Sequence, residues 1–286
     1  MDAKLFFKEI LLQLTVYTPQ EQRAIVFLVF EKLLCISRSD ILTDKYVPPL
    51  SKEQSEALAN IILQLNNSVP IQYLLKEADF FGNTFYVDSR VLIPRQETEE
   101  LVACIISEAD KVQPISILDI CTGSGCIAIS LAKALTNAKV DAVDISIGAL
   151  EVANLNSERN NTAVSFYPQD ILAPLNPPIL HQQYDIIVSN PPYVTEMEKP
   201  LMAENVLGHE PHIALFVTND APLIFYAAIL KHAQMLLKSG GKIYFEINEQ
   251  FGAAVAQLMK QNGFENIRIL KDLSDKSRMA VGVWKG

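Results

Sequence analysis

The stretch from which the fold of this chain is best predicted reads Ile115-Ser116-Ile117-Leu118-Asp119-Ile120-Cys121-Thr122-Gly123-Ser124-Gly125. A short apolar run bounded by glycines is typical of a buried strand. The glycines let the backbone turn sharply and approach a ligand closely. A helix over about 126–135 is predicted to follow. The stretch therefore predicts the strand, loop and helix that open an α/β sheet, whose ligand sites lie at the carboxyl ends of its strands.

Strands and helices alternate through the rest of this region, which predicts an open, mostly parallel sheet with helices on both faces. A polar turn between the last two strands predicts that the sheet ends in an antiparallel pair. Further helices are expected at about 97–109, 147–159 and 221–238. The other six strands are predicted at Lys139–Val143, Val164–Tyr167, Tyr184–Ser189, Lys242–Ile247, Ile267–Leu270 and Met279–Trp284.

The first part of the chain has a different pattern. Thr18-Pro19-Gln20-Glu21 is a capping box with proline at the first helical position, and Ser51 and Gln54 repeat the capping pattern. Residues 70–95 then show short aromatic and β-branched runs around Gly82-Asn83, which is typical of a β-hairpin. We therefore predict three parts: a helical bundle at 1–68, a β-hairpin linker at 69–95 and an α/β domain at 96–286.

Composition bounds the function classes. The 286 residues are 49% hydrophobic, which allows a sizeable core. A net charge of -9 argues against stable nucleic-acid binding, because phosphate contacts need clustered Lys and Arg. No apolar run is long enough to span a membrane, and the four cysteines lack the paired spacing of a zinc ribbon or disulfide framework. We expect a cytoplasmic protein with reduced thiols and no membrane partner.

Isolated histidines and acids give weaker signals. The acids Glu97, Glu99 and Glu100 are expected to stabilise a helix N-terminus, with fastening of the linker through Arg95 as the alternative. The histidines have no ligand spacing, so we expect no metal and interpret them as loop or surface residues. They are His181, His209, His212 and His232.

The glycine loop and an acidic strand end predict a nucleoside-type cofactor site. Asp144 ends the second strand 19 residues past Gly125, where a carboxylate can accept from both hydroxyls of a ribose. A pyrophosphate site would be expected to carry G-x-G-x-x-G, whereas this loop has one glycine pair preceded by Asp119. An acid there suits a cationic group. S-adenosylmethionine fits, and Asp170-Ile171 is expected near its adenine.

A second motif, Asn190-Pro191-Pro192-Tyr193, follows the strand predicted at Tyr184–Ser189. The Asn190 side-chain oxygen and the Pro191 carbonyl are two acceptors that can hold both hydrogens of an NH2 group. Tyr193 offers a flat face to a planar substrate. By itself the motif favours a strand end followed by a proline-stiffened turn. Combined with the cofactor loop, it predicts methyl transfer to a planar nitrogen.

These residues together resemble the PrmC/HemK family, the protein-(glutamine-N5) methyltransferases that act on peptide chain release factors. The resemblance covers most of the chain. It rests on Pro70–Leu74, Phe81-Gly82, Leu92–Arg95 with Glu97–Glu99, the 119–125 loop, Asp144, Asn190–Tyr193, and Gly240-Gly241 before Glu246.

The resemblance implies a Rossmann-like seven-stranded class I methyltransferase domain, preceded by a helical bundle that recognises the substrate. The implied substrate is the glutamine of the Gly-Gly-Gln motif in class I release factors. Two positions depart from the family pattern: Cys121 replaces the first glycine of the loop, and Gln96 replaces a proline. The implied cofactor contacts are Cys121, Thr122, Gly123, Ser124, Gly125, Asp144, Ile171 and Asn190, and the implied catalytic residues are Asn190, Pro191, Pro192 and Tyr193.

Two other functions compete with this prediction. A DNA adenine-N6 methyltransferase would also present an NH2 group on a flat ring, although the acidic balance and the lack of a basic reading segment argue against it. A non-catalytic adaptor for a translation factor is the second alternative. The intact glycine pair, Asp144 and Asn190 argue against a decayed site.

Overall fold

The structure, a computed structural model, describes residues 2–286 and divides them into two compact units. The first contains the residues through Glu77 together with Ala203–His209. The second contains Ala78–Met202 and Glu210–Gly286. Each unit has a hydrophobic core of its own.

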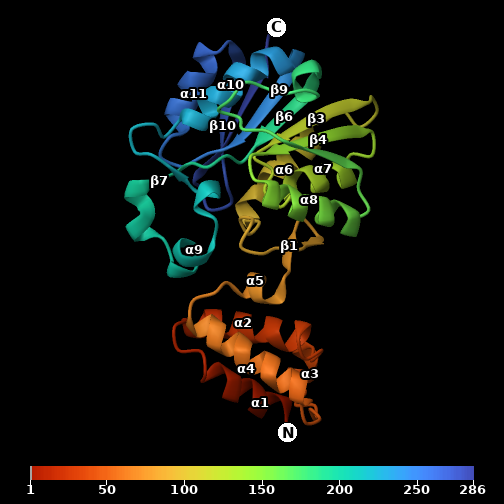
Figure 1. The fold of residues 1–286 in the computed structure, drawn as a ribbon, viewed down its shortest axis with the longest axis vertical. Coiled ribbons are helices and arrows are strands. Elements are labelled where there is room, and N and C mark those ends of the chain that lie inside the picture. Colours follow the sequence, from red (N-terminus) through yellow and green to blue (C-terminus); the bar gives the residue numbers. More distant parts are fainter. Residues whose placement is uncertain (1) are drawn as a thin grey trace. The chain divides into compact units, whose positions relative to one another are not determined.

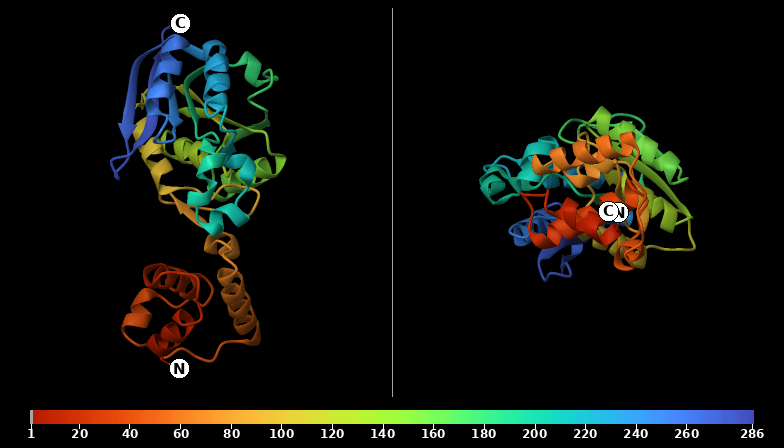
Figure 2. Two further views of the ribbon diagram at one scale, coloured as in Figure 1. Left: turned by 90° about the vertical axis from the view of Figure 1, so that its left-hand side faces the viewer. Right: turned by 90° about the horizontal axis from the view of Figure 1, so that it is seen from below.

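The first unit is a bundle of short helices (Figures 1 and 2). Its core contains the buried side chains of Phe6, Val26, Phe30 and Leu65. The predicted capping boxes are both present, so helices begin after Thr18 and Ser51 as expected. The helices are α1 (Ala3–Leu11), α2 (Pro19–Lys32), α3 (Arg38–Leu42), α4 (Lys52–Asn66), α5 (Ile71–Leu75) and, from later in the chain, α9 (Glu204–His209).

The predicted hairpin opens the second unit. Strands β1 (Ala78–Phe80) and β2 (Asn83–Phe85) pair antiparallel around Phe81 and Gly82, both of which have a positive φ. Phe80 and Phe85 bury their rings edge to face, 6.0 Å apart, in the core of the second unit. The hairpin is therefore anchored by its apolar face.

A seven-stranded sheet forms the centre of the second unit, as the sequence predicts (Figure 1). The strand order is β10-β11-β9-β6-β3-β4-β5, in which β3, β4, β5, β6 and β9 run parallel and β11 is antiparallel to both of its neighbours. The strands are β3 (Ile115–Ile120), β4 (Ala138–Asp144), β5 (Val164–Pro168), β6 (Tyr184–Ser189), β9 (Leu237–Glu246), β10 (Phe264–Lys271) and β11 (Ser277–Trp284).

Helices cover both faces of this sheet. Alternate residues of a strand therefore pack into different cores. Ile117 and Ile186 pack with the hairpin and the helices α6 (Gln96–Glu108) and α7 (Cys126–Ala134), beside which lies α8 (Ile147–Arg159). Leu118 and Ile187 face the other way, toward α10 (Ile224–Leu236) and α11 (Gly252–Gln261). This is the doubly wound arrangement expected of strands buried on both faces.

The parallel strands bring their carboxyl ends to one edge. The chain order reverses between β3 and β6, the two central neighbours, so the loops that leave them diverge at this switch point. The register pairs Ile120 with both Val143 and Ser189, and Ser189 with Phe245. The residues that follow β3, β4, β6 and β9 are therefore held at one level of the sheet.

Some elements are absent from the sequence prediction. Helix α11 is one. The chain after Tyr193 also forms short pieces: a parallel pair of β7 (Val194–Thr195) with β8 (Phe216–Val217), and the 3-10 helices η2 (Glu196–Leu201) and η3 (His212–Ala214). A further 3-10 helix, η1 (Ile179–His181), precedes β6.

Candidate active site

A cavity of about 320 Å³ opens at the carboxyl edge of the sheet. Most of its lining is apolar, and the Asp144 carboxylate and the Asn190 amide are among its polar groups. Its volume lies within the range usual for small-molecule sites. Of the predicted site residues, the cavity brings together Cys121, Thr122, Gly123, Ser124, Asp144, Ile171, Asn190 and Pro192.

The loop between β3 and α7 turns through three positive-φ residues, Cys121, Gly123 and Gly125. A Cβ on Gly123 would meet no atom within 4 Å, so the backbone there faces open space. Gly125 is crowded, since a Cβ would come within 3.0 Å of the Ile129 side chain. Cys121 takes the left-handed path that a glycine adopts without strain, at a cost of about 1–2 kcal/mol. The loop thus keeps its shape despite the departure at this position.

Asp144 ties the end of β4 to this loop. Its Oδ2 accepts the Gly123 N–H at 2.8 Å, and its Oδ1 accepts the Ser146 N–H at 2.9 Å. Burial raises the pKa of Asp144 above the ordinary range, although both backbone bonds oppose the rise. Each oxygen keeps a further lone pair, so the carboxylate can accept hydroxyl donors from the cavity.

Asp119 lies fully buried beneath the loop. Its Oδ2 accepts the Thr122 hydroxyl at 2.6 Å and the Ala128 N–H at 3.2 Å, which fixes the start of α7. Within the described residues, its Oδ1 has no hydrogen-bond partner. Burial raises the pKa of Asp119 to about 7. This side chain therefore supports the loop from below, and its expected contact with a cationic group stays a prediction.

The second motif begins where β6 ends. Asn190 and Pro192 line the cavity, whereas Pro191 and Tyr193 are not among its lining residues within the described chain. The Tyr193 ring packs against the core on the α10 side. Its hydroxyl donates to Glu246 Oε1 at 2.9 Å. The motif is thus more than a stiff turn, because it carries one amide to the cavity and anchors its aromatic ring beside it.

Glu246 ends β9 and is the buried polar group behind this motif. Its Oε2 accepts the Thr98 hydroxyl at 2.6 Å, and the Asn190 Nδ2 donates to the Thr98 oxygen at 3.3 Å. Burial raises the pKa of Glu246, while the bonds from Thr98 and Tyr193 lower it. Glu246 thus joins the end of β9 to the first turn of α6 and to the Asn190–Tyr193 motif.

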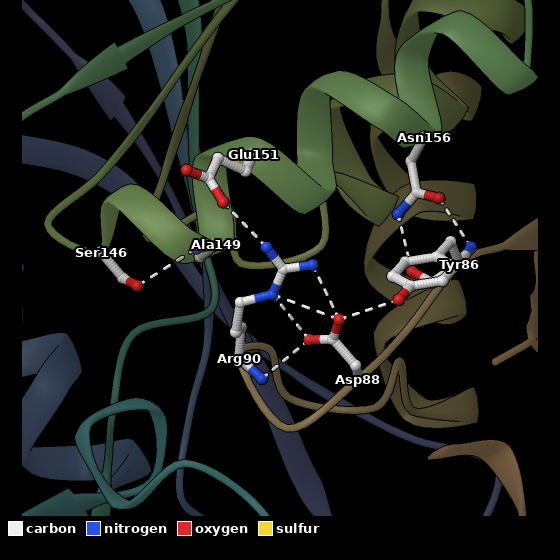
Figure 3. A network of polar contacts seen from close by, with 7 residues as sticks. All are labelled: Tyr86, Asp88, Arg90, Ser146, Ala149, Glu151 and Asn156. Carbon is white, nitrogen blue, oxygen red and sulfur yellow. Dashed lines mark hydrogen bonds and ion pairs between the residues drawn. The ribbon is translucent and has the colours of Figure 1, made fainter. Parts of the chain in front are cut away.

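One wall of the cavity comes from the segment after the hairpin, Arg90 to Arg95. Figure 3 shows how the residues that lead into this segment, from Tyr86 to Arg90, are held. Asn156, on α8, accepts the Tyr86 N–H at 2.6 Å and donates to the Tyr86 carbonyl at 2.9 Å. It also donates to the Ser124 carbonyl at 2.9 Å. One buried amide thereby joins Tyr86, shortly before the wall, to the glycine loop.

Arg90 completes the same fastening (Figure 3). Its guanidinium donates to both oxygens of Asp88 and, at 2.8 Å, to Glu151 on α8. The bond from Arg90 lowers the pKa of Asp88 to about 2. The alkyl part of Arg90 packs against Gly148, where a Cβ would meet Arg90 Cδ at 3.1 Å. The wall is therefore tied to α8 by charge and by packing.

The far end of this wall is held by a residue that the sequence analysis missed. Glu210 is buried and accepts from the Arg95 guanidinium at 2.6 Å and from the Ile93 N–H at 3.1 Å. Of the three predicted helix-start acids, Glu97 and Glu99 lie in the first turn of α6. Glu99 also accepts the Phe81 N–H at 2.9 Å, so it fastens the hairpin as well. No sequence signal marked Glu210, which lies in an irregular segment.

One interpretation of the histidines is wrong. His232 lies on α10, partly buried, with its Nε2 3.1 Å from the Ile171 carbonyl. Its partner Ile171 lines the cavity, so the His232 ring lies next to the cavity lining. The spacing of histidines in the sequence does not show this contact, because the two residues are far apart in the chain. Among residues 2–286, no group of three or more His, Cys, Asp or Glu side chains is arranged to hold a metal ion.

A membrane-spanning segment is also not found. No helix in the described part of the chain has the length and apolar character needed to cross a bilayer.

Comparison with known proteins places this site in a family. Residues 97–212 match the family model "Methyltransferase small domain". Among solved structures, a methyltransferase from Pyrococcus furiosus superposes with a TM-score of 0.52 at 19% identity, over 83% of this chain and 100% of that one. This likeness supports the class I methyltransferase fold.

Curated relatives are considerably closer in sequence. A release factor glutamine methyltransferase from Bacteroides thetaiotaomicron is 44% identical over 92% of this chain and 93% of the relative. One from Flavobacterium psychrophilum is 41% identical, over 93% of each chain. Identity of this extent covers both units. The chain therefore belongs to the release factor glutamine methyltransferase family.

Proposed function

We propose that this protein transfers a methyl group from S-adenosylmethionine to the side-chain amide nitrogen, N5, of the glutamine in the Gly-Gly-Gln motif of class I peptide chain release factors. The observation that carries the proposal is the position of Asn190 in the cavity that Asp144 and the glycine loop also line. The 44% identity to a relative named for this activity supports the same substrate. Such a substrate fits a cytoplasmic protein, since release factors act in translation.

The residues present fit this cofactor. The open space at Gly123 and the paired acceptors of Asp144 suit a ribose, and the apolar Ile171 suits a base. We assign Cys121 to Gly125, Asp144, Ile171 and Asn190 to the cofactor. When bound, S-adenosylmethionine supplies a methyl group on a sulfonium, an electrophile that needs no metal ion.

The chain's own task is to present a poor nucleophile. An amide nitrogen shares its lone pair with the carbonyl, so it must be held in a geometry that releases the pair. In the proposed reaction the cavity-lining Asn190 accepts one N–H through its Oδ1, and the carbonyl of the adjacent Pro191, which is outside the described lining, accepts the other. Neither Pro191 nor Pro192 has an N–H to compete. Orientation of this kind supplies about 7–11 kcal/mol of a barrier.

Methyl transfer places a positive charge on the substrate nitrogen, which is removed when that nitrogen loses a proton. S-adenosylmethionine, held by Asp144 and the glycine loop, would supply the methyl group: the N–CH3 bond would form as the S–CH3 bond broke, and the electron pair of the broken bond would stay on sulfur. Positive charge develops on the amide nitrogen, where the Asn190 and Pro191 oxygens stabilise it. The nitrogen then loses one proton to water. No strong base among the cavity residues is required, because the methylated cationic nitrogen is acidic.

The helical unit is proposed to recognise the release factor. It carries the N-terminal helices and α9 as one compact body with a core separate from that of the catalytic unit. Substitutions on its surface are then expected to raise KM for the release factor and to leave cofactor binding unchanged.

The test is the intact mass of a purified class I release factor after incubation with the protein and S-adenosylmethionine. A control factor carries a replaced glutamine in its Gly-Gly-Gln motif. A gain of one methyl group only in the factor with glutamine supports both activity and site. Cofactor binding without any gain would move the substrate elsewhere, and duplex DNA would be assayed next.

A further inference from the structure

A chain of buried hydrogen bonds connects the end of β9 with Asn190. Thr98 and Glu246 are each 2% exposed, and their side chains meet at 2.6 Å. The Asn190 Nδ2 lies 3.3 Å from the same Thr98 oxygen. The three residues come from the first turn of α6 and the ends of β6 and β9. Three separate elements thus converge at the cavity, which Thr98 and Asn190 both line, with Glu246 behind them.

The direction of the protons along this chain is fixed. A threonine hydroxyl has one proton, and a 2.6 Å contact with a carboxylate is typical of a charge-assisted O–H donor. The Thr98 oxygen can therefore only accept from Asn190. An amide turned the other way would place its Oδ1 against a lone pair, in a site with little water to relieve the repulsion.

The other oxygen of the same carboxylate is also occupied. Tyr193 donates to Glu246 Oε1 at 2.9 Å, so Glu246 accepts from both ends of the Asn190–Tyr193 motif, once directly and once through Thr98. With Tyr193 holding Oε1, Oε2 stays directed at Thr98. The carboxylate therefore has a single arrangement that satisfies both donors.

We propose that Thr98 and Glu246 are positioning residues that fix the rotation of the Asn190 amide, so that its Nδ2 faces Thr98 and its Oδ1 faces the substrate amide. The proposal rests on the proposed function, in which that oxygen accepts an N–H of the substrate glutamine. If the Asn190 amide could rotate, its Nδ2 would for part of the time face the substrate N–H, and two hydrogen-bond donors would then oppose each other. The loss would appear in the methyl-transfer step and not in cofactor binding.

The test compares Thr98→Val with Thr98→Ser. Valine keeps the shape and removes the hydroxyl, whereas serine keeps the hydroxyl. We expect Thr98→Val to lower kcat for release factor methylation by about tenfold or more, because it loses part of an acceptor interaction whose complete removal costs about 10²–10³. Thr98→Ser should stay within about threefold of wild type. The Kd for S-adenosylmethionine, measured by calorimetry, should change less than about threefold in both variants.

Two further variants separate positioning from stability. Glu246→Gln should also lower kcat, since its amide can donate to Thr98 and release the threonine proton toward Asn190. The double variant Thr98→Val with Glu246→Gln should have a kcat no lower than that of the slower single variant, because both substitutions act through the same chain of hydrogen bonds to Asn190. Ser116→Ala removes a hydroxyl that lies 2.8 Å from the Asp185 carboxylate, at the opposite edge of the sheet, and should lower Tm with kcat unchanged.

Several results would overturn the inference while the proposed function stands. These are an active Thr98→Val enzyme beside an inactive Asn190→Ala enzyme, a Thr98→Ser enzyme as slow as Thr98→Val, or a loss of kcat in Ser116→Ala equal to that in Thr98→Val. If the wild type methylates no release factor, the proposed function fails, and this inference fails with it.

Discussion

The Tyr193 hydroxyl donates a 2.9 Å hydrogen bond to Glu246, which joins the loop after β6 to the end of the neighbouring strand β9. Burial raises the pKa of Tyr193 well above its ordinary value, so the phenol keeps its proton and stays a donor. The ring cannot rotate freely while this bond and its core contacts persist. The motif therefore has a rigid aromatic end beside a cavity-lining amide.

Replacement of Asn190 by alanine should abolish methylation of the release factor. The side chain is the proposed acceptor for the substrate N–H, and its loss removes the stabilisation of the charge that develops on nitrogen. Cofactor affinity should stay within a few fold, measured by calorimetry. Asn154→Ala, on α8, removes an amide that donates to the Leu150 carbonyl of its own helix, and should leave turnover unchanged. Normal turnover in Asn190→Ala would exclude the acceptor mechanism.

Replacement of Asp144 should act on the cofactor. Asp144→Ala removes a charged acceptor for ribose hydroxyls and frees the Gly123 and Ser146 N–H groups, so we expect Kd for S-adenosylmethionine to rise about 10- to 100-fold. Asp144→Asn keeps one acceptor and should show a smaller rise. Calorimetric titration measures both. An unaltered Kd in Asp144→Ala would show that the ribose is held elsewhere.

The sheet could be predicted because its strands are buried on both faces. Such strands read as apolar runs, and β3 and β6 begin and end at the predicted residues. The strands β9, β10 and β11 begin earlier than predicted, at Leu237, Phe264 and Ser277. In β9, Ser239, Gly240 and Gly241 break the apolar pattern. The capping boxes at Thr18 and Ser51 could also be predicted, because each is formed by residues three positions apart in the sequence.

The contacts around the site could not be predicted, because they join residues far apart in the chain. Thr98 and Glu246 are 148 residues apart, and Glu210 reaches Ile93 across 117. The segment after Tyr193 has no periodic pattern. It is held by side-chain bonds such as that from Thr195 to Glu198, which a hydrophobic pattern does not record.

Stability should depend on pH through Asp119. Its folded-state pKa is about 7, above the value of about 3.9 in an unfolded chain. A group with a raised folded pKa contributes stability that is complete below the unfolded pKa and is lost as pH rises through the folded pKa. Linkage therefore predicts that this group lowers the free energy of unfolding by about 2–3 kcal/mol between pH 5 and pH 8.

Urea unfolding, followed by the fluorescence of the single tryptophan, Trp284, measures this dependence. Asp119→Asn removes the titrating group and should flatten the fall between pH 5 and pH 8. Asp220→Asn, an exposed position, makes the same change of charge and should leave the slope as in the wild type. Equal slopes in wild type and Asp119→Asn would refute the assignment.

The cavity wall should depend on the buried Glu210. Arg95→Ala leaves this carboxylate with the Ile93 N–H as its donor. We expect the free energy of unfolding to fall by about 2–3 kcal/mol. The loss is smaller than for a fully buried pair, because the Arg95 side chain is 34% exposed. The double variant Arg95→Ala with Glu210→Gln should recover part of it. Lys285→Ala, which breaks an exposed ion pair with Glu265, should cost much less, because solvent screens that pair. Equal losses at both sites would show that Glu210 is not desolvated.

Gly125 should be the least replaceable glycine of the loop. Its φ is +80°, and a Cβ would lie 3.0 Å from the Ile129 side chain and 3.1 Å from that of Ala153. Gly125→Ala therefore combines a backbone strain of about 1–2 kcal/mol with overpacking of about 1–3 kcal/mol. We expect a loss of about 2–5 kcal/mol in urea unfolding, together with weaker cofactor binding, since the start of α7 must shift.

The hairpin offers a matched control for this variant. Gly82 has a similar φ of +70°, but a Cβ there would meet nothing within 4 Å. Gly82→Ala should therefore show the backbone strain alone, about 1–2 kcal/mol, with Kd for S-adenosylmethionine unchanged. The difference between the two losses isolates the crowding against Ile129 and Ala153. If both variants lose the same free energy, the close packing of the loop on α7 and α8 makes no separate contribution.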